Sequence, residues 1–207
     1  MRNFRPESFP MDFTQDIELA TDRVRLSPLR PAHYEALLAV VLGNADLVRY
    51  SPSLLRSGAQ LEDYIRAALA ARHRGQRYPF VIFDERAGRY VGSTSYGNVS
   101  AHDQRLEIGW TWLDHSVRGA GLNRHAKFLL LRYAFEELDY RRVEFKTDAR
   151  NERSRRAIAK IGGTEEGTLR SHTLMPDGFR RDTVYFSILR EEWAGLRETV
   201  FADLETA

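Results

Sequence analysis

Hydrophobic residues recur every three or four positions in four stretches of the chain, and this spacing predicts four amphipathic helices. The stretches are residues 31–43, about 60–74, 122–138 and 151–162. Pro31 opens the first stretch and Gly43 ends it, while Asn151 is a natural N-cap for the last stretch and Gly162 a C-terminal stop. The segment between the first two helices contains Ser-Pro and Ser-Gly and is expected to be an irregular loop.

Alternating hydrophobic and polar residues predict strands in the rest of the chain. Two short runs within residues 17–29, on either side of Thr21 and Asp22, indicate a hairpin or a bent first strand. Three runs between residues 78 and 113 indicate an antiparallel meander, and residues 141–148 and a hairpin around "PDGF" supply the last strands. A strand on each side of the third helix implies one parallel pair in an otherwise antiparallel sheet.

The composition of the 207-residue chain suits one domain, which we expect over residues 17–200 after a flexible extension, residues 1–16. The 31 Lys and Arg residues nearly balance the 29 Asp and Glu residues, which argues against nucleic acid as a partner. The absence of cysteine excludes a covalent cysteine intermediate and suits a reducing, cytoplasmic location. Because the chain has no membrane-length apolar run and its histidines lack metal-ligand spacing, we expect neither a membrane partner nor a metal.

The turn "RGAG", residues 118–121, stands directly before the third predicted helix. Gly119 and Gly121 allow consecutive backbone N–H groups to face one point at the positively polarised start of that helix. Arg118 and Arg124 add positive charge, so the turn favours a phosphate group. It is neither a dinucleotide-binding fingerprint, which needs a third glycine, nor a P-loop, which needs Lys-Ser/Thr. A plain tight turn before a surface helix is the alternative.

The order of these elements resembles the GNAT superfamily of acyl-CoA N-acyltransferases. The resemblance covers about residues 24–193 and rests on the strand at 105–113, the Arg-Gly-x-Gly turn, and the "N-x-x-S" helix that ends in glycine. The segments "EIGWTWLDHSVRGAGLN" and "RRVEFKTDARNERSRRAIAKIGG" look most like the Rim-type branch, whose members acetylate the N-termini of ribosomal proteins. The resemblance implies an α+β fold in three layers, with a mixed, mostly antiparallel sheet of six to seven strands, one splayed parallel pair and helices on both faces.

The resemblance also implies a site for acetyl-CoA as cosubstrate. Backbone amides of the turn would hold the diphosphate, and the pantetheine arm would pair with the strand that precedes the turn. Asn151 would bind a pantetheine amide, and Arg155 could meet the 3′-phosphate. The implied acetyl-CoA-binding residues are Trp110, Thr111, Trp112, Leu113, Arg118, Gly119, Ala120, Gly121, Leu122, Asn123, Asn151, Ser154 and Arg155.

Glu107 occupies the "E-I" position from which the family's glutamate takes a proton from the attacking amine. Simple alternation along the strand would place Glu107 on one face with Arg105 and Thr111. A solvated Glu107, or one paired with Arg105, is therefore the alternative to a catalytic base.

Two further residues are candidates for acid–base catalysis. Ser154 would protonate the departing thiolate, because the tyrosine that many family members use is replaced here by Ile158. His172 lies near the position of a second proposed base in Rim-type enzymes, although a solvated surface histidine is the alternative.

These features predict an acetyl-CoA-dependent N-acetyltransferase that transfers the acetyl group directly to a primary amine, with a protein or peptide N-terminal α-amino group as one acceptor. The acceptor could instead be a small amine such as a polyamine, an amino acid or an aminoglycoside. A non-catalytic acyl-CoA-binding regulatory module is a third alternative, since Ser116 and Ile158 depart from the family pattern. A monomer and a homodimer are both compatible with the sequence.

Overall fold

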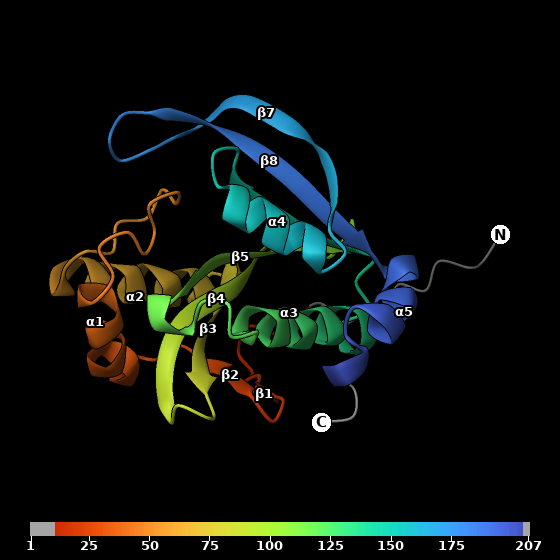
Figure 1. The fold of residues 1–207 in the computed structure, drawn as a ribbon, viewed down its shortest axis with the longest axis horizontal. Helices are drawn as coiled ribbons and strands as arrows, with labels where there is room; N and C mark the ends of the chain where they lie inside the picture. Colours follow the sequence, from red (N-terminus) through yellow and green to blue (C-terminus); the bar gives the residue numbers. More distant parts are fainter. Residues whose placement is uncertain (1–10, 205–207) are drawn as a thin grey trace.

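The computed structural model describes residues 11–204, which form one eight-stranded mixed sheet flanked by helices (Figure 1). The strand order is β1-β2-β3-β4-β5-β6-β8-β7, with β5 and β6 as the parallel pair. The strands are β1 (Leu19–Ala20), β2 (Val24–Pro28), β3 (Arg77–Asp84), β4 (Arg89–Ser100), β5 (Arg105–Leu113), β6 (Arg142–Asp148), β7 (Thr164–Leu174) and β8 (Arg180–Leu189). The predicted fold class is confirmed, with eight strands instead of six or seven because the first hairpin contributes two.

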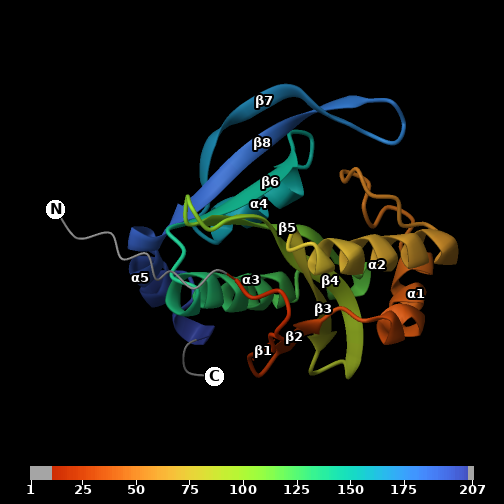
Figure 2. The same ribbon diagram turned by 180° about the vertical axis from the view of Figure 1, so that it is seen from behind.

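Helices cover both faces of the sheet (Figures 1 and 2). The α-helices are α1 (Tyr34–Leu42), α2 (Gly58–His73), α3 (Leu122–Arg132), α4 (Glu152–Lys160) and α5 (Arg190–Thr199). The short helical turns are η1 (Pro31–His33), η2 (His115–Val117), the π-helical η3 (Tyr133–Glu137) that continues α3, and η4 (Ala202–Leu204). The sequence predicted the first four α-helices and missed α5. In the part of the chain that the structure describes, no helix has the length and apolar character needed to cross a membrane.

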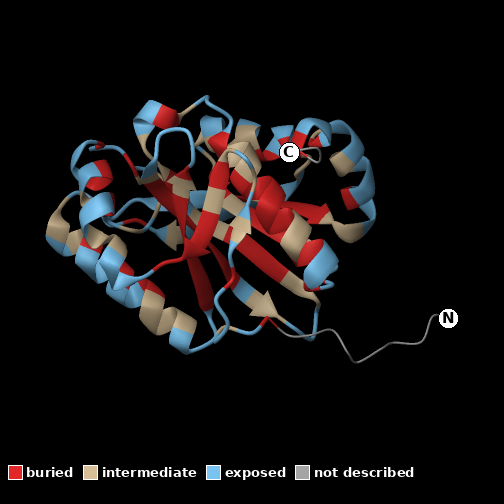
Figure 3. Ribbon diagram, turned by 90° about the horizontal axis from the view of Figure 1, so that it is seen from below, coloured by how far each residue is buried: buried red, intermediate tan, exposed pale blue. Residues whose placement is uncertain are grey.

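The two helical layers pack against opposite faces of the sheet in two hydrophobic cores. One core joins Leu37 of α1 and Ile65 of α2 to Val81 of β3. The other core joins α3, α4 and α5 to the central strands, and Figure 3 shows the buried residues along those strands and α3. Trp193 of α5 lies within 6.1 Å, centroid to centroid, of Phe128 on α3. The C-terminal helix α5 therefore packs against the core of its own chain.

The N-terminal extension predicted for residues 1–16 falls only partly within the described residues. Residues 1–10 lie outside them. Met11 is 4% exposed and belongs to the core under α3. Arg72 of α2 donates hydrogen bonds to the carbonyls of Phe13 (2.9 Å) and Gln15 (2.8 Å). Residues 11–16 are thus packed and hydrogen-bonded, which differs from the loose segment that the sequence predicted.

β5 and β6 are paired along only part of their length. Their register joins Arg105–Glu107 to Arg142–Glu144, and the two strands have no later pairs. β5 also contains a β-bulge against β4, where Trp110 adopts a φ of +51°. A bulge adds one unpaired residue and bends the strand. In the register of β5 with β6, Glu107 forms the last pair before the two strands separate, and residues 108–113 belong to the separated part of β5.

Candidate active site

The start of α3 leaves several backbone N–H groups free. Gly119 and Gly121 have φ angles of +80° and +82°, a left-handed conformation that residues with a Cβ rarely adopt. Among residues 11–204, no acceptor meets the N–H groups of Gly119, Gly121, Leu122 and Asn123. The N–H of Ala120 is already bonded to the carbonyl of Val117 (3.3 Å). Four of the amides assigned to the diphosphate are therefore available, which is the pattern of an anion site at a helix N-terminus.

Two arginines near this turn lack a carboxylate partner. Burial, and next the charge of Arg153, lower the pKa of Arg118. Burial and the same two guanidinium groups lower the pKa of His115. In the described part of the chain neither Arg118 nor Arg153 has a carboxylate within 4.0 Å. Because like charges gathered here repel one another, an anion bound at the turn would be stabilised.

The other arginines that the sequence singled out are already paired. Arg155 Nη2 lies 3.1 Å from Glu165 Oε2. Arg124 is bonded to the carbonyl of Val200 (3.1 Å from Nε) and to the Asp203 carboxylate. Arg153 is consequently a better candidate than Arg155 for an additional phosphate contact, and Arg124 does not face the turn.

The bulge in β5 changes which residues share a face. The two neighbours of Glu107 pack into the core under α3, so Glu107 points to the opposite face. The Thr111 hydroxyl, in contrast, accepts a hydrogen bond from Lys127 of α3 (2.7 Å). The expectation that Thr111 shares a face with Glu107 is wrong, because the additional residue at Trp110 inverts the alternation.

Glu107 is 7% exposed and is bound by two partners. Its Oε2 accepts a hydrogen bond from Asn98 Nδ2 (2.6 Å) and lies 2.8 Å from Lys146 Nζ on β6. Burial alone would lower the pKa of Lys146, but the hydrogen bond and charge of Glu107 outweigh it and raise this pKa. Glu107 is therefore not paired with Arg105, whose guanidinium contacts other carboxylates. The ion pair with Lys146 spans the two strands just beyond their last pair.

His172 is connected to Glu107 through two intermediate side chains. Its Nδ1 lies 3.1 Å from the Thr183 hydroxyl, and its ring stands edge-on to Tyr185 with centroids 5.8 Å apart. The Lys146 ammonium lies 4.9 Å from the centroid of the same tyrosine ring. The structure thus brings both candidate bases into one network on the face of the sheet away from α4.

The start of α4 presents one amide and one hydroxyl. Asn151 Oδ1 caps the helix by accepting a hydrogen bond from the N–H of Ser154 (3.1 Å). Within residues 11–204 the Asn151 Nδ2 and the Ser154 hydroxyl have no partner. Ile158 is buried in the core with α3. Asn151 and Ser154 are consequently free to make the contacts that the resemblance assigns to them.

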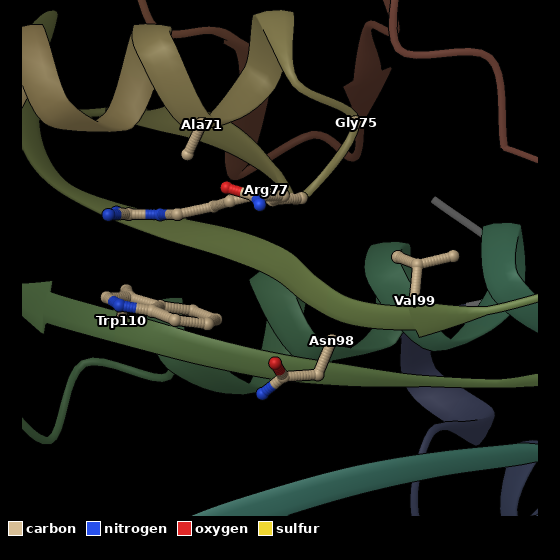
Figure 4. Close-up of a pocket in the computed structure, with 7 residues that line it drawn as sticks. Ala71, Gly75, Arg77, Asn98, Val99 and Trp110 are labelled. Atoms are coloured by element: carbon tan, nitrogen blue, oxygen red, sulfur yellow. The ribbon is translucent and has the colours of Figure 1, made fainter.

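A pocket of about 480 Å³ opens between the end of α2 and strands β3 to β5 (Figure 4). Figure 4 shows the Arg77 side chain above the Trp110 ring, and its guanidinium carbon lies 4.9 Å from the ring centroid. Asn98 lines the same pocket and donates its hydrogen bond to Glu107. The pocket therefore adjoins the candidate base. The pocket was not predictable from the sequence, because its residues come from separate strands and meet only through the register of those strands.

Two lysines at the site were also missed. Lys127 lies one turn after Asn123 and is buried among the apolar residues of α3. A lysine among these apolar positions could have been recognised from the sequence. Lys146 gave no such signal, because its proximity to Glu107 depends on the register of β5 and β6.

Comparison with known proteins is consistent with this site. The model of the family described as "Acetyltransferase (GNAT) domain" matches residues 23–164. The "Putative ribosomal N-acetyltransferase YdaF" of Bacillus subtilis (strain 168) is 37% identical over 108 residues, which make up 52% of this chain and 58% of YdaF. A GCN5-related N-acetyltransferase from Brucella melitensis superimposes with a TM-score of 0.85 at 26% identity, covering 93% of this chain and 87% of its own. Mycobacterium smegmatis RimJ in complex with CoA-disulfide shares the fold, with a TM-score of 0.77, 24% identity and coverage of 95% and 97%.

The family match runs from β2 to the first residue of β7. It includes the start of α3, the separated part of β5 and β6, and the start of α4. The chain therefore belongs to the GNAT family of N-acetyltransferases.

Proposed function

We propose that the protein transfers the acetyl group of acetyl-CoA directly to a primary amine, with a protein or peptide N-terminal α-amino group as its acceptor. One arrangement carries the proposal. The free N–H groups at the start of α3 lie next to the segment where β5 and β6 separate, and Glu107 stands at the last pair of those strands. This arrangement supports transfer from a CoA thioester, which needs an anion site at one end of the strand and a proton acceptor further along it.

The cosubstrate fits the residues at the start of α3. Two negative charges on a diphosphate would meet four free amides and the unpaired Arg118 and Arg153. The extended pantetheine arm would follow the unpaired edge of β5 at Trp110–Leu113, with Asn151 and Ser154 on the other side. Backbone N–H groups near Trp112 and Leu113 would stabilise the oxyanion, for which one donor contributes about 3 kcal/mol in comparable sites.

Glu107 would receive the proton of the attacking amine. Asn98 and Lys146 hold its carboxylate in one orientation, so that it needs little reorganisation during the reaction. His172 remains the second candidate base, since it reaches Glu107 only through Tyr185 and Lys146. The absence of cysteine excludes an acyl-enzyme held as a cysteine thioester, which supports direct transfer of the acetyl group.

The ion pairs formed by Glu107 and Asp148 favour an α-amino group over a polycation as acceptor. The Glu107 carboxylate is paired with Lys146, and the Asp148 carboxylate with Arg150 (2.7 Å). Both of these carboxylates already have a cationic partner, so neither is left to bind a polyamine or an aminoglycoside. An α-amino group, with a pKa near 8, is also closer to neutral at pH 7 than a lysine, with a pKa near 10.4. The name of YdaF, a putative ribosomal N-acetyltransferase, is consistent with a ribosomal protein as acceptor.

An amino acid is the second candidate acceptor, because of Arg77. This side chain is 8% exposed, lines the pocket beside Asn98, and has no carboxylate within 4.0 Å in residues 11–204. An acceptor with a carboxylate near its amine would supply the missing anion. The cytoplasmic location, the oligomeric state and the absence of metal, membrane and nucleic-acid partners stay predictions of the sequence.

Thiol release from acetyl-CoA, measured with N-terminal peptides, amino acids and polyamines, tests the proposal. We expect peptides to be acetylated, initial-rate plots to intersect, and Glu107→Gln to lower kcat by about a hundredfold. The exposed Glu62 on α2 provides the matched control Glu62→Gln, which should retain full activity. Parallel rate plots with an acyl-enzyme would contradict direct transfer. Tight CoA binding without turnover of any amine would instead support the regulatory-module alternative.

A further inference from the structure

Lys127 of α3 is buried without a counterion. It is 5% exposed, and its Nζ donates hydrogen bonds to the hydroxyls of Thr111 on β5 (2.7 Å) and Thr94 on β4 (3.4 Å). The two hydroxyls are also 2.8 Å apart and bonded to each other. No carboxylate lies within 4.0 Å of Nζ in the described part of the chain.

Within residues 11–204 the Lys127 ammonium is bonded to no charged group. The carboxylate of Asp203 is paired with Arg124, the neighbouring cation on α3. His125 is bonded to the Thr21 hydroxyl (3.0 Å). The elements packed against Nζ thus contribute hydroxyls only, and burial lowers the pKa of Lys127 to about 7. A methionine would fill a similar volume without this electrostatic cost, so stability does not account for a lysine here.

Thr111 connects this buried ammonium to the surface. The residue is exposed, lies next to the bulge and belongs to the part of β5 that has no partner on β6. The proposed function runs the pantetheine arm along this part of the strand. Ser154, the acid predicted from the sequence, has no cation bonded to its hydroxyl, whereas Thr111 accepts a hydrogen bond from one.

We propose that Lys127 and Thr111 form a proton relay that protonates the departing CoA thiolate. The inference rests on the proposed function, because the relay needs the thioester beside Trp110–Leu113. When the amine nitrogen bonds to the carbonyl carbon, the C–S bond breaks and its electron pair stays on sulfur. The Thr111 hydroxyl proton passes to sulfur, and the Lys127 ammonium returns a proton to the Thr111 oxygen. Lys127 is left neutral and is protonated again from water after the thiol departs.

Within this relay Thr111 is the catalytic residue and Lys127 acts through it. The two threonines therefore offer a matched pair of variants, Thr111→Val and Thr94→Val. Each variant removes one hydroxyl bonded to Lys127 and keeps the side-chain shape, but only Thr111 is exposed on the separated part of β5. A purely structural role for the lysine predicts similar effects from both variants.

Steady-state kinetics from pH 6 to pH 9, with CoA affinity from calorimetry, test the relay. At pH 6 we expect Thr111→Val and Lys127→Met to lower kcat by about a hundredfold while the Kd of CoA stays unchanged. Thr94→Val should stay within about twofold of wild type. Above a pH of about 7 the advantage of wild type over Lys127→Met should shrink by about tenfold per pH unit, because Lys127 loses its proton.

Three results would overturn the relay. They are equal losses in the two valine variants, a wild-type advantage over Lys127→Met that does not change with pH, and full activity in Thr111→Val. Failure of the proposed function is distinguishable, because it would appear as a wild-type protein that binds no CoA or consumes no acetyl-CoA. A loss confined to Ser154→Ala would return the role of acid to that serine.

Discussion

Replacing Lys127 with methionine should stabilise the protein at neutral pH, by an amount that depends on pH. In the folded state burial lowers the pKa of Lys127 to about 7 from an ordinary value of 10.5. Between these two values the unfolded chain binds more protons at this residue than the folded chain does. The free energy of unfolding of the wild type therefore rises as pH rises through this window. Below pH 7 the lysine is protonated in both states, and its contribution to the free energy of unfolding no longer changes with pH.

The size of the effect follows from the two pKa values. At pH 7 the lysine lowers the free energy of unfolding by about 4 kcal/mol, relative to a residue whose pKa is the same in the folded and unfolded states. At pH 9 the cost falls to about 2 kcal/mol, because pH 9 lies only about 1.5 units below the pKa of the lysine in the unfolded chain, compared with about 3.5 units at pH 7. Methionine carries no proton, so its variant escapes both costs. The stability advantage of Lys127→Met should accordingly shrink by about 2 kcal/mol between pH 7 and pH 9.

Urea denaturation of both proteins at pH 7 and pH 9, followed by tryptophan fluorescence, measures this difference. The comparison uses the change in the variant's advantage, so titrating groups elsewhere cancel. The exposed lysine at the end of α4 gives a control, Lys160→Met, whose advantage should not change with pH. An advantage for Lys127→Met that is equal at the two pH values, or a variant less stable than wild type at pH 7, would refute the reasoning.

Three other substitutions test the site. Gly121→Ala should destabilise the protein by about 1 kcal/mol and weaken CoA binding, because the φ of +82° strains any residue with a Cβ even though no atom lies near the new Cβ. The control Gly195→Ala lies within α5 and should stabilise the protein. Urea denaturation measures the stability of both variants, and calorimetry measures their affinity for CoA. Arg153→Gln should weaken CoA binding more at low salt than at high salt, and a salt-independent loss in calorimetry would contradict a phosphate contact. Lys146→Met should cost about 3 kcal/mol in urea denaturation by leaving Glu107 buried without its cation, and the double variant with Glu107→Gln should recover part of that loss.

The local parts of the site were predictable from the sequence. The glycine-rich turn and the Asn151 cap depend on residues within a few positions of each other, so their geometry follows from φ preferences and helix ends. The parallel pair also followed, because a strand, a helix and a strand in sequence have few possible connections.

The parts that depend on register were not predictable. Simple alternation placed Thr111 beside Glu107, but a non-glycine residue, Trp110, adopts a positive φ and shifts the pattern. Arg105 of the same strand was the alternative partner considered for Glu107, whereas Lys146 of the neighbouring strand occupies that role. The segment that contains Trp193 forms the helix α5 by packing against α3, and the sequence predicted no element there.

The short pairing of β5 with β6 gives the sheet two inner edges in addition to its two outer ones. An edge has backbone donors and acceptors without a strand partner, and a second chain normally completes it. Here both inner edges belong to the same molecule and converge at Glu107, so one thin, extended, amide-bearing molecule can pair with both. Only three residue pairs join β5 to β6, and such a guest would add a second connection between strands β1 to β5 and strands β6 to β8. Occupancy and resistance to unfolding are then coupled, and the saturated protein melts as a more cooperative unit than the empty one.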